Sequence, residues 1–220
     1  MKYILEQIIS ILFPEHCIGC NKYNTPLCEK CMNIIPTTVT TEVLDTYSLF
    51  SYKHPYVRDG IWAMKYKNTK SYARVFGKRL CEIIEADMLE KDNFISSYII
   101  IPVPISKKKR KIRGYNQTEW LTEGIWLYMN KELSHKIIYR KDILKRYHRE
   151  TTQARTSDRQ DRLEQIEGAF YIEKSKQAIL KNKHILLIDD VTTTGGTIKE
   201  IQKILHASHV ASVTAYTIGH

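Results

Sequence analysis

Hydrophobic and polar positions recur along the chain with two periods, which predict alternating strands and helices. The β-branched runs at 97–105 ("SYIIIPVPI") and 184–189 ("HILLID") are nearly all apolar, as expected for parallel strands covered on both faces. Apolar residues at helical spacing predict helices near 70–90, over 116–129 and over 197–208. Further strands are predicted at 46–52, 135–144 and 210–218, a further helix between 52 and 70, and a polar helix begun by Ser157 or Asp158. This order predicts an α/β fold, an open parallel sheet with flanking helices on both sides.

The first residues, "MKYILEQIISILF", predict an amphipathic helix docked on the body of the protein. Ile4, Ile8 and Ile11 fall on one helical face. A secretory signal is disfavoured because Glu6 and Gln7 interrupt the apolar stretch and no small-residue cleavage site follows. No apolar run approaches the roughly 18 residues of a membrane span. We therefore expect a cytoplasmic protein without membrane insertion.

Four of the five cysteines form two C-x-x-C pairs, "CIGC" and "CEKC": Cys17, Cys20, Cys28 and Cys31. Four soft thiolates predict one tetrahedral structural Zn²⁺, with an iron–sulfur cluster or a redox pair as the alternatives. A four-thiolate site has no open position, so it would stabilise a module rather than catalyse. We expect residues 1–45 to form an amino-terminal helix and zinc module, and residues 46–220 the main domain. Cys81 lies alone in a helical pattern and is expected to be a buried small hydrophobe.

The formal charge is +10, from 34 Lys and Arg against 24 Asp and Glu. Such a surface attracts phosphates, either of a small ligand or of nucleic acid. The most concentrated basic run, "KKKRK" at 107–111, is expected in a loop after the strand at 97–105. A solvated loop without a ligand is the alternative interpretation of this run.

The segment "HILLIDDVTTTGGTIKE" at 184–200 predicts a site for a 5-phosphorylated ribose. A strand ends in Asp189 and Asp190 and leads through a Thr/Gly loop into a helix. Backbone N–H groups, hydroxyls and the helix terminus suit a phosphate, and paired carboxylates suit vicinal sugar hydroxyls. A Walker A loop and a G-x-G-x-x-G fingerprint are both absent here. Ligands of open parallel sheets lie beyond the carboxyl ends of strands, so the loops after 104 and 190 are the expected site.

The motif "ILLIDDVTTTGGT" resembles the phosphoribosyl pyrophosphate (PRPP) motif of type I phosphoribosyltransferases. The resemblance implies that Asp189 and Asp190 bind the ribose 2′ and 3′ hydroxyls. It assigns the 5′-phosphate to the loop residues Thr193, Thr194, Gly195, Gly196 and Thr197.

The stretches "AMKYK" (63–67), "IPVPISKKKRKIRGYNQ" and "TTQA…RLEQIEGAF", with the cysteine module, resemble the ComF family of competence proteins. Members of the ComFC type have a phosphoribosyltransferase fold and an amino-terminal zinc finger. The resemblance places the pyrophosphate side at Pro102 to Pro104 and at a motif with four marked residues, Arg113, Gly114, Asn116 and Gln117. Tyr115 stands where Phe is commoner. Gln165 stands where Asn usually follows the Arg of an R-x-x-N motif, and this departure leaves the role of Arg162 open.

The family resemblance implies DNA uptake in natural transformation more firmly than it implies a reaction. An active phosphoribosyltransferase would use Mg²⁺ with PRPP, and Asp189, Asp190 and Arg113 would position the sugar and stabilise charge. Single-stranded DNA and a competence helicase are the expected partners, with Tyr115 and Trp120 as candidate aromatic contacts. Trp120 fits a core position better. A nucleobase phosphoribosyltransferase of nucleotide salvage is the alternative, and the zinc module argues against it.

Overall fold

The computed structural model of the chain describes residues 15–37, 43–90, 97–129, 136–147 and 166–220. Three parts of the sequence interpretation lie outside these residues. They are the amphipathic helix expected in the first 13 residues, the polar helix expected to begin at Ser157 or Asp158, and the neighbourhood of Arg162 and Gln165.

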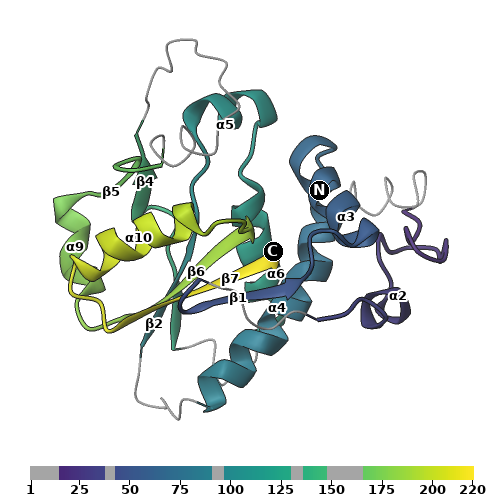
Figure 1. Ribbon diagram of the computed structural model, residues 1–220, viewed down its shortest axis with the longest axis horizontal. Coiled ribbons are helices and arrows are strands. Elements are labelled where there is room, and N and C mark those ends of the chain that lie inside the picture. The colour runs from purple at the N-terminus through teal and green to yellow at the C-terminus, as the bar shows by residue number, and fades with distance from the viewer. Residues whose placement is uncertain (1–14, 38–42, 91–96, 130–135, 148–165) are drawn as a thin grey trace, which may run out of the picture.

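Within the described residues, five strands form one parallel sheet (Figure 1). Its order is β1 (Thr46–Phe50), β7 (Ser212–Gly219), β6 (His184–Val191), β2 (Tyr98–Pro102) and β3 (Ile137–Tyr139). Every neighbouring pair in it is parallel. The predicted open parallel sheet is confirmed. Its central strands β2 and β6 are the two apolar, β-branched runs that predicted burial on both faces.

Helices cover both faces of this sheet (Figure 1). One face packs against α3 (Pro55–Tyr66), α4 (Lys70–Glu90) and α6 (Gln117–Tyr128). The other packs against α10 (Gly196–His206), α9 (Lys174–Leu180) and a small antiparallel pair, β4 (Leu144–Arg146) with β5 (Phe170–Ile172). Each face of the sheet has its own hydrophobic core. Alternate residues of β6 pack into one or the other, because successive side chains of a strand point to opposite faces.

The strand predicted at 135–144 is two strands in two sheets. Between β3 and β4, the Arg140 guanidinium donates hydrogen bonds to Asp142 at 2.7 and 2.8 Å, and Lys176 of α9 contacts the same carboxylate at 2.7 Å. This polar turn redirects the chain, so that β4 pairs with β5 instead of continuing along β2. The apolar pattern on its two sides gave no sign of the turn.

The basic run expected in a loop is the helix α5 (Lys107–Arg113). The Ser106 side chain caps it by accepting a hydrogen bond from the Lys109 N–H, and Gly114 ends it with a φ of 80°. Lys and Arg are good helix formers, and Ser before them with Gly after them supplies both ends of a short helix. The loop interpretation was therefore wrong.

The helix after α5 buries a narrower face than its sequence suggested. Leu121, Ile125 and Met129 are buried as expected, and Trp120 is partly buried against the same core. Leu127 and Tyr128, which belong to the same apolar pattern, are instead 65% and 46% exposed.

The cysteine module packs into the main core. Cys17, Cys28 and Cys31 belong to the same hydrophobic cluster as Phe76 of α4, together with Met32 of the short helix α2 (Glu29–Asn33). Cys81 is 2% exposed, as predicted. None of the helices that the structure describes has the length and hydrophobicity needed to cross a membrane.

Candidate functional site

The two loops singled out in the sequence begin side by side. Strands β2 and β6 are hydrogen-bonded neighbours, with Pro102 in register with Ile188. Since both strands run in the same direction, the chain leaves both at the same edge of the sheet. This arrangement brings Asp189 and Asp190 next to the segment that leads into α5 and α6.

Asp190 is the centre of a buried polar network. Its side chain is 7% exposed, and the Lys65 ammonium lies 3.0 Å from Oδ1. Gln117 donates a hydrogen bond of 2.6 Å to Oδ2, and Arg113 donates one of 2.8 Å to the Gln117 amide oxygen. Three residues of the predicted site, Arg113, Gln117 and Asp190, are therefore joined in one chain of contacts.

Lys65 is a site residue that the sequence interpretation missed. It comes from the last turn of α3, and its side chain is 21% exposed. Burial acts to lower the pKa of Lys65, but the charges of Asp190 and Asp189 outweigh it and raise this pKa. The ammonium therefore stays charged and holds Asp190 in place. Its sequence signal was only the stretch "AMKYK", in which nothing distinguishes Lys65 from Lys67.

Asp189 lies beside this network, with a hydrogen bond of its own and a raised pKa. Its Oδ1 accepts a hydrogen bond of 2.8 Å from the Asp190 N–H. Burial and the neighbouring charge of Asp190 raise the pKa of Asp189 to about 7, although Lys65 and Lys109 act in the opposite direction. The two carboxyls thus have unlike environments, and Asp189 is poised to titrate near neutral pH.

Two further cations interact electrostatically with the paired acids. Burial, together with the charges of Arg113, Arg146 and Lys65, lowers the pKa of Lys109. Burial also lowers the pKa of Arg146, and the nearby charge of Asp189 opposes that shift. Cations that crowd one another in this way leave positive charge that two carboxylates do not neutralise, which suits a polyphosphate. Arg146 was not predicted, because it lies in β4, outside the two loops in which the site was expected.

The Thr/Gly loop encloses a cavity of about 70 Å³ that is lined by residues 192–198 and Asp189. Drug-sized ligands occupy pockets of roughly 300–1,000 Å³, so this volume suits one small group such as a phosphate. The helix α10 begins at Gly196 and directs its N-terminal N–H groups there. Gly195 has a φ of 71°, and a Cβ atom at this position would collide with Val43. The cradle therefore requires glycine for both conformation and space.

Two other predicted residues hold the elements around the site together through hydrogen bonds. The side chain of Asn116 is buried, caps α6 through the Thr118 N–H and donates to the Val103 carbonyl at 3.1 Å. The Tyr115 hydroxyl donates to the Met64 carbonyl at 2.8 Å and accepts from the Asn68 N–H at 3.2 Å. Tyr115 thereby ties α5 and α6 to the end of α3, next to Lys65.

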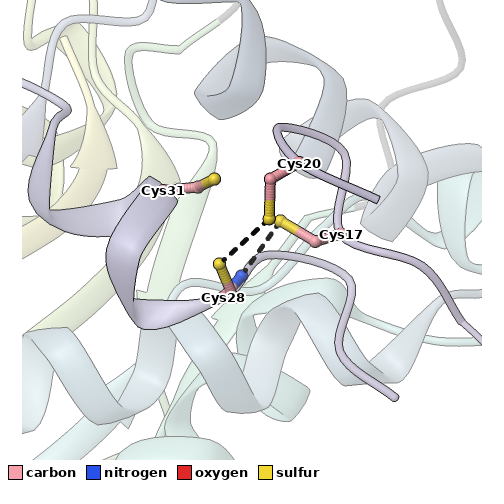
Figure 2. Close-up of side chains that lie close together, drawn as sticks. All are labelled: Cys17, Cys20, Cys28 and Cys31. Carbon is pink, nitrogen blue, oxygen red and sulfur yellow. Dashed lines mark hydrogen bonds between the residues drawn. The ribbon is translucent and has the colours of Figure 1, made fainter. Parts of the chain in front are cut away.

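The four cysteines of the two C-x-x-C pairs form a second site. Figure 2 shows their sulfurs pointing toward a common centre, and all four lie within 4.8 Å of one another. The Cys20 and Cys28 sulfurs are 3.6 Å apart, close to the roughly 3.8 Å that tetrahedral Zn–S bonds of about 2.3 Å require. All five cysteines of the chain are free thiols. The cluster can therefore bind a metal such as zinc.

Backbone groups prepare one of these thiols for metal binding. Burial would raise the pKa of Cys17, but hydrogen bonds from the backbone of Cys28, Cys20 and Gly19 outweigh burial and lower it to about 6. One of them runs from the Cys28 N–H to the Cys17 sulfur at 3.3 Å, and it is drawn in Figure 2. Burial and the neighbouring thiols raise the pKa of Cys31 to about 12. Such repulsion among thiolates is what a bound cation relieves.

Comparison with known proteins finds a phosphoribosyl transferase domain and relatives among the competence proteins. The phosphoribosyl transferase domain family matches residues 127–218. Competence protein ComFC of Streptococcus pneumoniae is 26% identical over 205 residues, 93% of this chain and 80% of that protein. Competence protein F of Haemophilus influenzae is 32% identical over 120 residues, or 54% of this chain and 49% of its own. The DNA utilization protein YhgH of Escherichia coli K12 is 27% identical over 119 residues, 54% and 48% of the two chains.

The chain thus spans about half the length of Competence protein F and of YhgH. Among solved structures, a hypoxanthine phosphoribosyl transferase of Trypanosoma cruzi matches with a TM-score of 0.43 and 12% identity, over 68% of this chain and 65% of that one.

Proposed function

Because the chain is a ComFC-type relative of the competence proteins and has a phosphoribosyltransferase fold, we propose that it binds PRPP with Mg²⁺ and acts in DNA uptake. The observation that carries the proposal is the pairing of Asp189 and Asp190 with the Thr/Gly cradle at one edge of the sheet. The carboxylates accept hydrogen bonds from the ribose 2′ and 3′ hydroxyls, and the 70 Å³ cavity holds the 5′-phosphate.

The surrounding cations receive the pyrophosphate of PRPP. Lys109 and Arg113 come from α5, and Arg146 comes from β4. Mg²⁺, when bound with PRPP, would neutralise part of the pyrophosphate charge. Lys65 pairs with Asp190 and fixes its position, so that the carboxylate meets the ribose without rearrangement.

A transferase reaction is the second candidate, and the cations beside the acids favour it. An acceptor nucleophile would form a bond to ribose C1 while the bond from C1 to the pyrophosphate oxygen breaks. The electron pair of the broken bond would leave with pyrophosphate, whose charge Lys109 and Arg113 stabilise. Release of pyrophosphate on addition of a nucleobase separates this activity, including the nucleotide-salvage alternative, from binding alone.

The zinc module and the location belong to the same proposal. Zn²⁺ held by Cys17, Cys20, Cys28 and Cys31 would stabilise the module that packs on α4. Cysteines that form no disulfide are typical of a reducing compartment, which agrees with a cytoplasmic protein. Single-stranded DNA and a competence helicase are the proposed partners in uptake.

Calorimetric titration with Mg²⁺-PRPP tests the clamp. The wild type should bind PRPP only with Mg²⁺, and Asp190→Asn should weaken binding at least tenfold, because the substitution removes the charge that faces Lys65 and the ribose. The control Glu123→Gln changes an exposed carboxylate paired with Lys70 and should bind like the wild type. Equal affinity of Asp190→Asn and the wild type would show that the ribose lies elsewhere.

A further inference from the structure

Two aromatic rings stand open on the outer side of α3, next to the clamp. Trp62 and Tyr66 lie one helical turn apart, with ring centroids separated by 5.6 Å. They are 49% and 61% exposed. Neighbouring large rings left this open form a surface that folding alone does not explain.

A cation stands over each ring. The Lys67 ammonium lies 5.1 Å from the centroid of Trp62, and the Arg113 guanidinium lies 5.1 Å from the centroid of Tyr66. Alternating rings and cations are the pattern that holds single strands, in which bases stack on the rings and phosphates meet the cations.

A groove of about 620 Å³ continues this surface toward the cysteine module. Trp62 and Lys67 line one side of it, and Ile18, between the cysteines of the first pair, lines another. Asp59, the acidic residue in its lining, forms an ion pair of 3.1 Å with Arg58. The volume lies within the roughly 300–1,000 Å³ of small-molecule sites, which is enough for one nucleotide.

In the other direction the surface runs to the clamp and to α5. Arg113, which faces Tyr66, also hydrogen-bonds Gln117, and Gln117 contacts Asp190. Lys107, Lys108 and Lys111 of α5 are exposed. In Figure 1, α3 and α5 both lie at the end of the sheet toward which β6 points.

We propose that Trp62, Tyr66, Lys67, Arg113 and the adjoining groove form a strand-binding surface for single-stranded DNA. Bases stack on Trp62 and Tyr66, and backbone phosphates contact Lys67, Arg113 and the lysines of α5. The choice of DNA rests on the proposed function, whereas the preference for single strands follows from the rings. A duplex offers no open base faces for them.

The aromatic residues first considered for this role are already engaged. Tyr115 and Trp120 stack on each other with centroids 3.8 Å apart and an interplanar angle of 13°. The two rings cover each other and are only partly exposed, unlike Trp62 and Tyr66, and the Tyr115 hydroxyl is held by α3. Trp62 and Tyr66 take their place as the stacking pair.

Binding of a fluorescein-labelled oligo-dT measured by anisotropy tests the surface. The wild type should bind the single strand more tightly than a duplex of equal length, and Trp62→Ala should raise Kd about tenfold, the loss typical of one stacked base. Trp126→Ala removes another exposed tryptophan, on α6, and should bind like the wild type. Thermal unfolding of each variant verifies that it is folded.

Two further variants separate stacking from charge. Trp62→Phe should keep most of the affinity and lose the quenching of tryptophan emission that a base stacked on Trp62 causes. Lys67→Gln should reduce the slope of log K against log salt by about 0.7, the contribution of one phosphate contact in a single strand. Trp62→Ala should leave that slope unchanged.

The outcomes distinguish this inference from the clamp. If Trp62→Ala binds oligo-dT as tightly as the wild type, or if the wild type binds duplex equally well or no DNA at all, the strand-binding surface is refuted. Titration of the same Trp62→Ala protein with Mg²⁺-PRPP tests the clamp independently. We expect wild-type PRPP affinity there, and the converse, PRPP binding lost with DNA binding kept, for Asp189→Asn.

Discussion

Asp190 is the carboxylate on which the candidate site depends, and its partners come from two different helices. Lys65 at the end of α3 and Gln117 at the start of α6 each contact one of its oxygens. Removing one partner of a buried pair leaves an uncompensated charge, whereas removing both leaves a polar but neutral site. Lys65 is thus a positioning residue for the clamp.

A double-mutant cycle tests this pairing. Lys65→Gln should lower the free energy of unfolding by roughly 3 kcal/mol, because the buried Asp190 then lacks its ion-pair partner. Lys65→Gln/Asp190→Asn should recover part of that loss, so the effects should not add. Urea unfolding of the four proteins gives the coupling energy. Strict additivity would mean that the ion pair does not form.

Asp189 predicts a pH dependence of stability. Its pKa is raised to about 7 in the folded chain, against about 3.9 when unfolded, so the folded state holds this proton more tightly. This contribution to stability is complete below about pH 4 and is lost as pH rises through 7. Between pH 5 and 8, the wild type should therefore lose stability relative to Asp189→Asn in urea unfolding. Parallel pH profiles would show that Asp189 titrates normally.

At the scale of elements, α5 determines how the cations reach the site. Its caps fix both ends, and its last turn carries Arg113 toward Gln117. The ion pair of Arg110 with Glu119, at 2.7 Å, holds α5 against α6. A loop would have presented the same residues in many arrangements, and ordering them on binding would reduce affinity.

Substitution of Gly114 tests whether α5 needs its left-handed end. A Cβ at this position meets no atom within 4 Å, so only the φ of 80° opposes a side chain. Gly114→Ala should cost about 1 kcal/mol of stability, and Gly114→Asn less, because Asn tolerates this conformation better. Thermal unfolding measures both. Equal stability of Gly114→Ala and the wild type would contradict the observed helix end.

At the scale of the whole molecule, the cysteine module and the sheet share one core. Cys17, Cys28 and Cys31 lie in the hydrophobic cluster that contains the central residues of α4. Loss of the metal should therefore disturb α3 and α4 as well as the module, and with them the wall of the strand-binding surface.

Metal removal provides the corresponding measurement. We expect one zinc per chain by elemental analysis and, after chelation, a single unfolding transition shifted to lower temperature, because the module does not melt alone. Cys28→Ser should lose the zinc, whereas Cys81→Ala should keep it, since Cys81 lies apart in α4. Two separate transitions would indicate that the module folds independently of the sheet.

The sequence alone determined the features that depend on neighbouring residues. The order of strand, two acids, Thr/Gly loop and helix at 184–200 can be read directly, because all of its parts follow one another in the chain. The two C-x-x-C pairs are equally local. The parallel sheet followed from apolar periodicity, which reports burial.

Tertiary structure decided what joins distant positions. Gln117 and Asp190 lie 73 residues apart, and no local pattern distinguishes Lys65, Arg146 or Trp62 from other residues of their kinds. The break between β3 and β4 likewise depends on Lys176 in α9. Local sequence shows which groups are available, but only the packing of α3, α5 and α6 around the sheet edge determines which of them meet.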